Sequence, residues 1–479
     1  MIILALEAST TSAKTMLFDT DSQETQVRTR RFEIASADPA VRDGDSLFTQ
    51  LMALGREAAA GRAVDLIALS GTYHGLTLRR PDLSALTPVQ EWPHTGAQDL
   101  CARLREDEAF TAWFYKRTGC MVNAIYPAFK LMLLKEQGVP LEGALVLDQN
   151  SLNFARMTGR TWTSPAQASG TGLLSTSSGD WDAEIVERLG LQGVVLPELH
   201  ASTDTAPLTA EAATLLGLRP GTPVLLPGPD GGLSQVGDGA SQPGDMTFSM
   251  GTSGALRFAA SAPVLSPRLS TWAYRSPVGW LSGAATSGCT NCVDWAKDRL
   301  FGAATSFEEI EPLLSTAKRD LPLFMPFLFG ERCPGWQDQR RGGFLELQPR
   351  HSRADMYQAV LHGVVFGLYH CYRELIAVGG TPRRILLSGG VLSSPFWTQL
   401  TADVFGTEME ISSLQHSSLV GAVRMALLSA GLDDDQPAFR EAGGRRRVIP
   451  DMERHAYYEG EFRRYLDGYA RTNPKELPA

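Results

Sequence analysis

The chain has 479 residues, too many for one hydrophobic core, so two or more domains are expected. Hydrophobic residues make up 43% and charged residues 20%, the composition of an ordinary globular protein. A formal net charge of −9 argues against a nucleic-acid partner, because binding many phosphates needs a basic face. The basic runs at 28–31 and 445–447 are short, and we expect them to be solvated edges.

The sequence also favours a reducing compartment without a membrane segment. No apolar run approaches the length that spans a bilayer, and Glu7 ends the apolar start too early for a signal peptide. Six cysteines without regular spacing are typical of the cytoplasm, where we expect the protein to reside. Cys289 and Cys292 form the one CxxC motif. With no second pair nearby, packing is favoured over a metal or redox role.

The first element in the chain is a predicted strand, hydroxyl-rich turn and strand. Residues 2–6 form an apolar run, residues 7–14 are rich in Ser and Thr, and a second strand is expected over 15–19. Residues 249–256 repeat this pattern. The echo indicates a duplicated fold with one phosphate-binding hairpin in each half, and a generic Ser/Thr hairpin is the alternative.

A third apolar strand, 64–69, leads into Ser70-Gly71-Thr72-Tyr73-His74-Gly75. Open α/β sheets place ligand contacts at the carboxyl ends of strands, so Tyr73 and His74 are candidate binding residues, with a structural histidine as the alternative. After a loop, the pattern predicts helices over 96–104, 106–116 and 129–137 and a short strand over 145–147. The segment 158–179 is rich in Ser, Thr and Gly and could be a flexible linker.

The second half is predicted to begin after a domain boundary near 208–222. A short strand, 224–226, is followed by Asp230 on a glycine-flanked turn. A strand from 246 then runs into Gly251-Thr252-Ser253-Gly254. This arrangement suits a carboxylate held beside a phosphate that backbone N–H and hydroxyl groups cradle. A helix cap at Asp230 and an ordinary tight turn are the alternative.

The clearest local signal comes late in the chain. After a long loop over 322–349, one helix is predicted over 352–378. Residues 385–388 read as a strand, Gly389-Gly390 as a tight turn, and 395–405 as a helix with Ser393 or Ser394 as its N-cap. Such a junction can seat part of a nucleotide, since no side chain blocks close approach. A last helix is expected over 451–469.

Together these motifs resemble the FGGY carbohydrate kinases of the actin, hexokinase and chaperone ATPase superfamily, from the first strand to about residue 426. Residues 389–406 are similar to the family's GGGxxSxxWxQxxADxxG signature, with Val391 where a third Gly is usual. Residues 330–334 with 341–344 resemble its GERxP…RGxF. The remaining matches are the second phosphate hairpin at 251–254, the late GA helix at 421–422 and the catalytic aspartate at Asp230.

The resemblance implies an α/β fold of two similar actin-like, ribonuclease-H-like ATPase domains around a central cleft. Residues 1–222 would form the sugar-side domain, 223–450 the nucleotide-side domain, and 451–479 a C-terminal helix that packs back on the body. The implied partners are a small-molecule sugar and ATP, without nucleic acid or membrane. The oligomeric state stays open, with a homodimer as one option.

The implied activity is ATP-dependent phosphorylation of a primary hydroxyl of a sugar, with ATP and Mg²⁺ as cofactors and Asp230 accepting the proton. The residues implied to face the β- and γ-phosphates are Thr10, Thr11 and Lys14 on one side and Gly251, Thr252 and Ser253 on the other. Those implied to flank the adenosine are Gly389, Gly390 and Phe396, and those implied to touch the sugar are Tyr73, His74, Trp92 and Asp230. Glu7 and Asp230 would hold Mg²⁺ through water.

Two departures from the family pattern concern the metal and the sugar. Glu7 stands where the first hairpin usually opens with Asp, and it adds one methylene to the same charge. Residues 92–96 read Trp-Pro-His-Thr-Gly, without the acid and base of the W-N-D-x-R that holds the sugar in many relatives. Residues 70–75 resemble the SGQMHG of xylulokinases, whereas 168–174 look closer to gluconokinases.

We therefore expect conversion of D-xylulose to D-xylulose 5-phosphate, with a gluconokinase or another polyol or ketose kinase as the alternative. A non-catalytic sugar- or nucleotide-binding relative is a rival of another class, and retention of Asp230, Thr252 and the Gly-Gly loop weighs against it. A chaperone-type ATPase would need an added substrate domain, for which only residues after about 430 remain.

Overall fold

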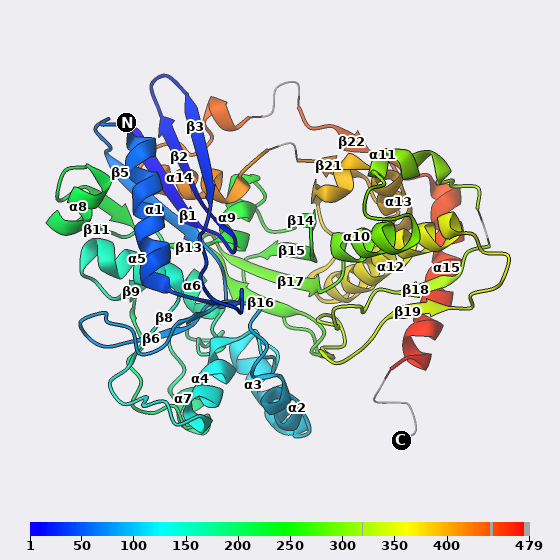
Figure 1. Ribbon diagram of the computed structural model, residues 1–479, viewed down its shortest axis with the longest axis horizontal. Coiled ribbons are helices and arrows are strands. Elements are labelled where there is room, and N and C mark those ends of the chain that lie inside the picture. Colours follow the sequence, from blue (N-terminus) through cyan, green and yellow to red (C-terminus); the bar gives the residue numbers. More distant parts are fainter. Residues whose placement is uncertain (319, 413, 441–443, 474–479) are drawn as a thin grey trace.

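Two mixed sheets of seven strands each form the frame of the protein. The structure, a computed structural model, describes residues 1–318, 320–412, 414–440 and 444–473. In Figure 1 the sheet of the first half (mainly blue) lies on the left, and the second sheet lies nearer the centre, with most helices of the second half to its right. The expected α/β class with two similar sheet-containing units is confirmed.

The first sheet has the strand order β11-β12-β5-β1-β2-β3, and β13 also pairs with β5. Its strands are β1 (Ile2–Ala8), β2 (Ser12–Asp19), β3 (Thr25–Arg31), β5 (Leu66–Gly71), β11 (Thr205–Pro207), β12 (Pro223–Leu225) and β13 (Gly228–Pro229). Every residue of β3 is exposed, as expected for the basic run at its end. Since β12 and β13 belong to this sheet, we propose a domain boundary after Pro229 rather than after Thr222.

The second sheet repeats the topology of the first. Its order is β16-β17-β15-β14-β20-β21-β22. Its strands are β14 (Asp245–Met250), β15 (Gly254–Ala260), β16 (Trp272–Arg275), β17 (Trp280–Thr286), β20 (Arg384–Gly389), β21 (Met409–Ile411) and β22 (Arg447–Val448). β14 is antiparallel to β15 and parallel to β20, just as β1 is antiparallel to β2 and parallel to β5. The echo noted in the sequence is therefore a repeated structural unit.

Helices cover the sheets and form an insertion in the first half. Those of the first half are α1 (Gly44–Ala59), α2 (Gln98–Arg105), α3 (Glu108–Thr118), α4 (Pro127–Glu136), α5 (Gln149–Thr158), α6 (Pro165–Ser169), α7 (Ala183–Arg188) and α8 (Ala210–Leu216). Those of the second half are α9 (Asp230–Gly237), α10 (Thr290–Leu300), α11 (Phe307–Ile310), α12 (Arg353–Gly379), α13 (Pro395–Phe405), α14 (Ser417–Ser429) and α15 (Met452–Arg471). In Figure 1, α2, α3, α4 and α7 gather below the first sheet.

Four short strand pairs complete the secondary structure. They are β4 (Val41–Arg42) with β7 (Val89–Gln90), β6 (Thr77–Arg79) with β8 (Leu145–Leu147), β9 (Trp162–Thr163) with β10 (Glu198–Leu199), and β18 (Leu323–Met325) with β19 (Gly343–Leu345). Short 3₁₀ turns span Glu311–Leu313, Gly390–Ser393 and Pro437–Phe439.

Both faces of β1 are buried, which explains its continuous apolar sequence. Leu4 and Leu6 join the core under α1, α5 and α8. Ile3 and Ala5 face the opposite way and pack with residues of α9 and α14. Because side chains alternate along a strand, a strand between two helical layers needs apolar residues at every position.

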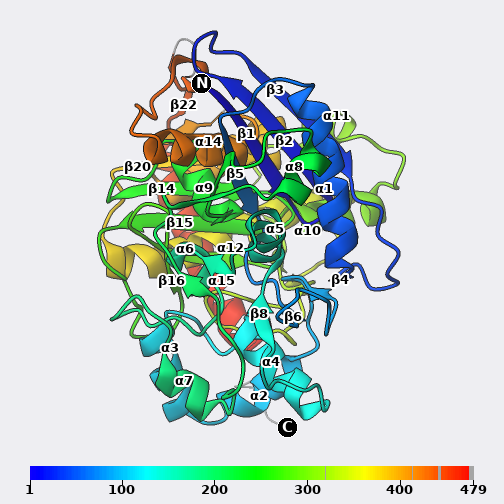
Figure 2. The same ribbon diagram turned by 90° about the vertical axis from the view of Figure 1, so that its left-hand side faces the viewer.

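Helices α9 and α14 pack against each other so closely that only glycine fits at their contact (Figure 2). A Cβ atom on Gly237 would lie 1.9 Å from the backbone oxygen of Ser417, and one on Gly421 would lie 1.9 Å from that of Leu233. The Gly421-Ala422 motif thus lets α14, late in the chain, fix the helix that begins at Asp230. α14 also packs on β1 and β5, so it ties the second half to the first sheet.

The linker interpretation of residues 158–179 is wrong. This segment contains β9 and α6, and several of its polar side chains are buried and hydrogen-bonded to the backbone of other segments. The Ser164 hydroxyl donates to the Pro227 carbonyl over 3.0 Å, and the Gln167 amide donates to that of Thr72 over 3.1 Å. Small polar residues here satisfy buried backbone groups, a function that composition alone does not distinguish from flexibility.

The sequence signals for helix ends were more reliable than the composition of segment 158–179. Ser352 caps α12 and Ser394 caps α13, each through its side-chain oxygen, and α13 stops at Gly406 in the left-handed conformation. The long loop predicted over 322–349 holds only the β18–β19 pair. α15 buries Tyr458, Phe462 and Tyr465 against the body. The C-terminal helix was predicted to include residues 474–479, which lie outside the described residues.

Candidate active site

Asp230 stands where the first sheet ends and α9 begins. It follows β13, which runs parallel to β5, and its Oδ1 accepts a hydrogen bond from the Gly231 N–H over 2.7 Å. Burial raises the pKa of the Asp230 carboxyl to about 6, the negative charge of Glu7 adds to the shift, and the guanidinium of Arg257 opposes it. At neutral pH the carboxylate form prevails, so this side chain can accept a proton.

A cavity of about 370 Å³ between the two halves brings Asp230 together with the first hairpin. Thr10 and Thr11 line it from the β1–β2 turn and Lys14 lines it from β2, so the three residues predicted to contact phosphate share one cavity with Asp230. Its lining residues are Glu7, Ser9, Thr10, Thr11, Lys14, Asp230, Gly231, Ser234, Asp238, Thr247, Ser249, Arg257, Ser388, Ser417 and Ser418. Hydroxyl groups are the most numerous on this surface, with two cations, Lys14 and Arg257, and three carboxylates beside them. The hydroxyl and cationic donors suit an oxygen-rich ligand.

Glu7 is buried at the floor of this cavity and already has three partners. Lys14 Nζ lies 2.7 Å from Glu7 Oε1, and the hydroxyls of Ser70 and Ser418 donate to Oε2. In the described part of the chain, no group of three or more His, Cys, Asp or Glu side chains could hold a metal ion. A Mg²⁺ ion would therefore depend on phosphate oxygens and water, which is its usual mode with nucleotides.

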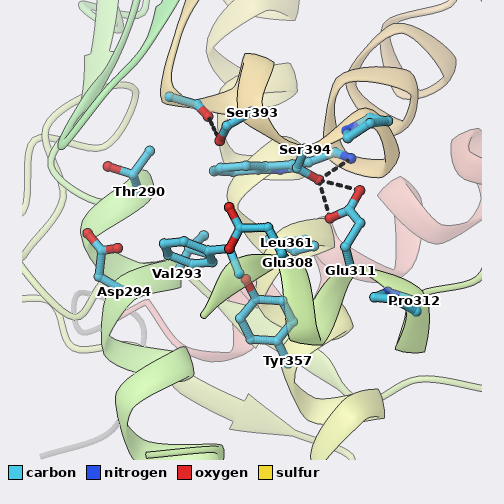
Figure 3. Close-up of a pocket in the computed structure, with 14 residues that line it drawn as sticks. Thr290, Val293, Asp294, Glu308, Glu311, Pro312, Tyr357, Leu361, Ser393 and Ser394 are labelled. Carbon is cyan, nitrogen blue, oxygen red and sulfur yellow. Dashed lines mark hydrogen bonds between the residues drawn. The ribbon is translucent and has the colours of Figure 1, made fainter. Parts of the chain in front are cut away.

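A second cavity, of about 680 Å³, lies beside the start of α13 (Figure 3). Its lining residues are Thr290, Val293, Asp294, Phe307, Glu308, Glu311, Pro312, Tyr357, Leu361, Gly390, Ser393, Ser394, Pro395 and Trp397. Apolar and aromatic side chains with a few polar groups form a slot of the kind that takes a planar base. Glu311 anchors its wall by accepting hydrogen bonds from the Ser394 hydroxyl and the Phe396 N–H.

Of the three residues predicted to flank the adenosine, Gly390 alone lines this slot. Phe396 packs toward the core, and Trp397 takes its place on the wall. Gly389 lies against the hairpin instead, where a Cβ atom would come 2.5 Å from the Met250 backbone oxygen. The rotation of α13 decides which of its side chains faces the slot.

The hairpin at 251–254 lies between the two cavities. The Thr290 N–H donates to the Gly251 carbonyl over 2.9 Å, and Thr290 lines the second cavity. On the other side Ser249, which precedes the hairpin, lines the first cavity. Thr252 and Ser253 line neither cavity. A nucleotide with its base in the slot and its phosphates near Asp230 would pass this turn.

The predicted sugar residues Tyr73 and His74 gather in an aromatic cluster that joins the two halves. Their rings lie 5.1 Å apart, and both lie within 5.6 Å of the Tyr274 ring on β16. Tyr126 and Tyr274 share a hydrogen bond of 2.6 Å between their hydroxyls. The Tyr73 hydroxyl is buried without a hydrogen-bond partner among the described residues and lies near Gly232, at the start of α9.

His74 has a fixed tautomer. Its Nδ1 lies 2.6 Å from the carbonyl oxygen of Gly170, which can only accept, so Nδ1 carries the proton. Burial lowers the pKa of His74 to about 3, so the ring is neutral and Nε2 is an acceptor. The backbone of His74 has a φ of 66°, in the left-handed region. A hydroxyl-bearing ligand could therefore donate to Nε2.

Trp92 connects the sugar-side loop with the phosphate hairpin. Its indole Nε1 donates to the Thr10 hydroxyl over 3.1 Å. The residue before it, Glu91, is buried and accepts from the Thr72 hydroxyl over 2.9 Å. An acidic residue thus stands before Trp92 rather than after it, and its carboxylate bonds a hydroxyl of the protein rather than a ligand.

Several residues of the site were missed from the sequence. Asp238, Ser417 and Ser418 line the first cavity, and Asp238 accepts hydrogen bonds from the hydroxyls of Ser412 and Ser417. Arg257 follows the 251–254 hairpin closely, and this proximity was the one available signal for it. Lys130 is fully buried on α4 and had no signal beyond being a cation in an apolar helix.

Other sequence expectations concern cysteines and membranes. Cys289 and Cys292 are buried, and burial raises the pKa of both thiols, which makes them poor nucleophiles and supports packing. Among the helices of the described residues, none combines the length and apolar character needed to cross a bilayer.

Comparison with known proteins gives two family matches that together span most of the chain. Residues 2–237 match the N-terminal domain and residues 246–430 the C-terminal domain of the FGGY family of carbohydrate kinases. The chain is 25% identical to a gluconokinase from Bacillus subtilis over 97% of this chain and 93% of that one. It is 24% identical to a xylulose kinase from Escherichia coli, over 95% and 96%.

Solved structures agree with the fold. A gluconate kinase from Lactobacillus acidophilus superposes with a TM-score of 0.89 at 24% identity, covering 97% of each chain. A ligand-bound xylulose kinase from the same organism gives a TM-score of 0.89 at 25% identity, also over 97% of each chain. The two-domain, actin-like ATPase architecture expected from the sequence motifs is thereby confirmed.

Proposed function

Because the chain belongs to the FGGY family of carbohydrate kinases, we propose that it transfers the γ-phosphoryl group of ATP to a primary hydroxyl of D-xylulose, forming D-xylulose 5-phosphate. The protein is a sugar kinase, and the enzymes of this family use ATP as the phosphoryl donor. The observation that carries the mechanism is the position of Asp230, whose carboxylate shares one cavity with Thr10, Thr11 and Lys14.

In the proposed reaction the sugar hydroxyl gives its proton to Asp230 while its oxygen forms a bond to the γ-phosphorus. The bond from phosphorus to the bridging oxygen breaks, and its electron pair leaves with ADP. A general base contributes typically about 10²–10⁴-fold, whereas alignment of two reactants can remove roughly 7–11 kcal/mol of the barrier. Positioning by the two cavities is therefore the larger contribution, as the loose transition state of phosphoryl transfer requires.

The phosphates of ATP would lie against Thr10, Thr11 and Lys14 and pass the turn at 251–254 toward the slot. Mg²⁺, when bound, neutralises phosphate charge, and Glu7 and Asp230 would hold it through water. This fits the three donors that already bind Glu7, since they occupy most of the lone pairs of its carboxylate. The adenosine would enter the slot that Tyr357 and Trp397 line.

The sugar would lie between Asp230 and the aromatic cluster. The neutral His74 would accept a hydrogen bond from a sugar hydroxyl at Nε2, and the buried Tyr73 hydroxyl would find the partner that the protein does not supply. Trp92, which donates a hydrogen bond to the Thr10 hydroxyl, would keep the β1–β2 hairpin in position relative to the sugar.

D-Gluconate is the second candidate substrate. Relatives called gluconokinase match 97% of the chain at 24% and 25% identity, about the level of the xylulose kinases. Residues 168–174 also resemble gluconokinases, and Gly170 of this segment holds the His74 ring. Both substrates, a ketose and an aldonate, carry a primary hydroxyl at the end of the carbon chain, so the same base can serve either.

A panel of ketoses, polyols and aldonates with ATP and Mg²⁺, scored by ADP release, tests the proposal. Activity on D-xylulose with the highest kcat/KM supports the first substrate, and activity on D-gluconate alone promotes the second. ATP binding without phosphorylation of any member of the panel would favour a non-catalytic binding protein.

A further inference from the structure

Arg257 brings a guanidinium group to the proposed base from the second sheet. The residue lies on β15, paired with Thr247 on one side and Gly283 on the other, and it lines the same cavity as Asp230. A Cβ atom on Gly231 would lie 3.2 Å from Arg257 Nε and 3.4 Å from its Nη2. Glycine next to Asp230 therefore lets the guanidinium approach the first turn of α9.

Most of the hydrogen-bonding capacity of Arg257 is uncommitted within the described residues. Its Nη1 donates to the Ser249 hydroxyl over 3.3 Å, a long bond, and no carboxylate of the part of the chain that the structure describes lies within 4.0 Å of its nitrogens. Lys14, the other cation of the cavity, is paired with Glu7 over 2.7 Å. An arginine presents several N–H donors in a rigid planar fork, so donors remain for a ligand oxygen.

The position of Arg257 indicates which ligand oxygen that is. Asp230 must contact the reacting hydroxyl, and the γ-phosphorus lies in line with that hydroxyl on its other side. Arg257 lines the cavity of Thr10 and Lys14, the proposed phosphate contacts, whereas the proposed sugar contacts Tyr73 and His74 do not line it. This places the guanidinium at the phosphoryl end of the substrate. The carboxylate of a six-carbon sugar acid would be at the opposite end of its chain, so recognition of that carboxylate does not fit this place.

We propose that Arg257 is a catalytic residue that donates hydrogen bonds to the transferred phosphoryl group. The inference rests on the proposed role of Asp230 as the base. While the proton moves to Asp230 and the bond to ADP breaks, charge spreads over the three peripheral oxygens of the phosphoryl group. Arg257 stabilises that charge and neither gives nor takes a proton.

The kinetic test compares Arg257→Gln and Arg257→Lys with the native enzyme. Loss of the planar guanidinium donors should lower kcat about 10²–10³-fold, the usual effect of removing one hydrogen-bond donor to a charge that develops in the transition state. The KM values for sugar and ATP should change less than about threefold, because the contact strengthens only in the transition state. Arg268→Gln is the matched control. This arginine is exposed, pairs with Glu374, and lines neither of the two site cavities.

A binding measurement separates this role from a structural one and needs no turnover. The complex of ADP with aluminium fluoride is an analogue of the transition state, in which the transferred phosphoryl group is planar. Calorimetry should show that Arg257→Gln binds ADP and Mg²⁺ as the native enzyme does but loses at least about tenfold in affinity once aluminium fluoride is added. In Arg257→Ala, added guanidinium at low millimolar concentration should restore part of the rate.

Two results would overturn the proposal. A raised KM for the sugar with unchanged kcat would assign Arg257 to the sugar. Equal weakening of ADP binding with and without aluminium fluoride would assign it to the structure of the cavity. Neither outcome depends on which sugar is the substrate. Conversely, near-native turnover by Asp230→Asn would refute the proposed base while leaving the aluminium fluoride measurement interpretable.

Discussion

Lys130 Nζ donates a hydrogen bond over 2.8 Å to the carbonyl oxygen of His74, so a buried cation on α4 holds the loop that carries the sugar-site histidine. The same ammonium donates to the Glu91 carbonyl over 2.8 Å and to that of Gln90 over 3.4 Å. One side chain thus joins the loop of His74 to the loop of Trp92. Both loops carry proposed sugar contacts, and the backbone bridge between Leu76 and Gln90 is a second link between them.

Replacing Lys130 by Met should damage sugar binding and stability together. The His74 carbonyl would lose its one donor among the described residues, at a cost of about 1–3 kcal/mol of the free energy of unfolding, and the two loops would lose one of their links. We expect the KM for sugar to rise about tenfold or more while the KM for ATP stays nearly constant. Lys135→Met, on the exposed side of the same helix, is the control. Equal effects of the two variants would disprove the anchoring role.

Asp230→Asn should keep ATP binding and lose turnover. The amide fills nearly the same space but cannot accept the proton, and loss of a general base costs typically about 10²–10⁴-fold in kcat. Calorimetry with a non-hydrolysable ATP analogue and steady-state rates measure the two properties separately. Asp82→Asn, on an exposed loop, controls for the change of charge. A rate close to that of the native enzyme would show that another group takes the proton.

The pH profile should report the Asp230 carboxyl. Its pKa is raised to about 6 by burial and by the charge of Glu7, and the ionised form is the active one. Activity as kcat/KM should therefore be constant above about pH 7 and fall tenfold per unit below about pH 6.

The Glu7→Gln variant sharpens this test. Removing the negative charge lowers the pKa of Asp230, so the acid limb of the profile should move to lower pH. Lys14, freed from Glu7, would shift it in the same direction. An acid limb that stays in place, or moves to higher pH, would show that the profile reports a different group.

Replacing His74 should affect the sugar far more than ATP. The neutral ring offers Nε2 as an acceptor, and one lost hydrogen bond to a buried ligand hydroxyl corresponds to a KM increase of about tenfold. His74→Ala removes the acceptor, whereas His74→Asn also suits the left-handed backbone at this position. Parallel increases of both KM values in both variants would move His74 out of the sugar pocket.

Gly390→Val should weaken ATP binding alone. A Cβ atom there would lie 3.3 Å from the Thr290 side chain and occupy the mouth of the slot, so we expect the KM for ATP to rise about tenfold. Gly460→Val, in α15 with space around it, is the control. An unchanged KM for ATP would place the nucleotide elsewhere.

The sequence predicted the helix ends, the buried strand and some of the residues that line the two cavities, because these features obey local rules. Ser352, Ser394 and Gly406 bound their helices through capping, and the apolar run at 2–6 required burial on both faces. A helix cap would explain the glycine-flanked turn at Asp230 equally well, and the resemblance to the FGGY signature favoured the role of base. These features depend on neighbours a few residues away.

Tertiary packing decided the rest, since it brings together groups that are distant in the chain. Ser418 donates to Glu7 from 411 positions away, and this contact commits the carboxylate that was expected at the metal. The rotation of α13 placed Trp397 rather than Phe396 in the slot, and the register of β15 turned Arg257 toward Asp230. The sequence by itself thus determined the elements and the type of chemistry. Which side chains meet in the cavity depended on helix rotation, strand register and glycine contacts, which local sequence does not encode.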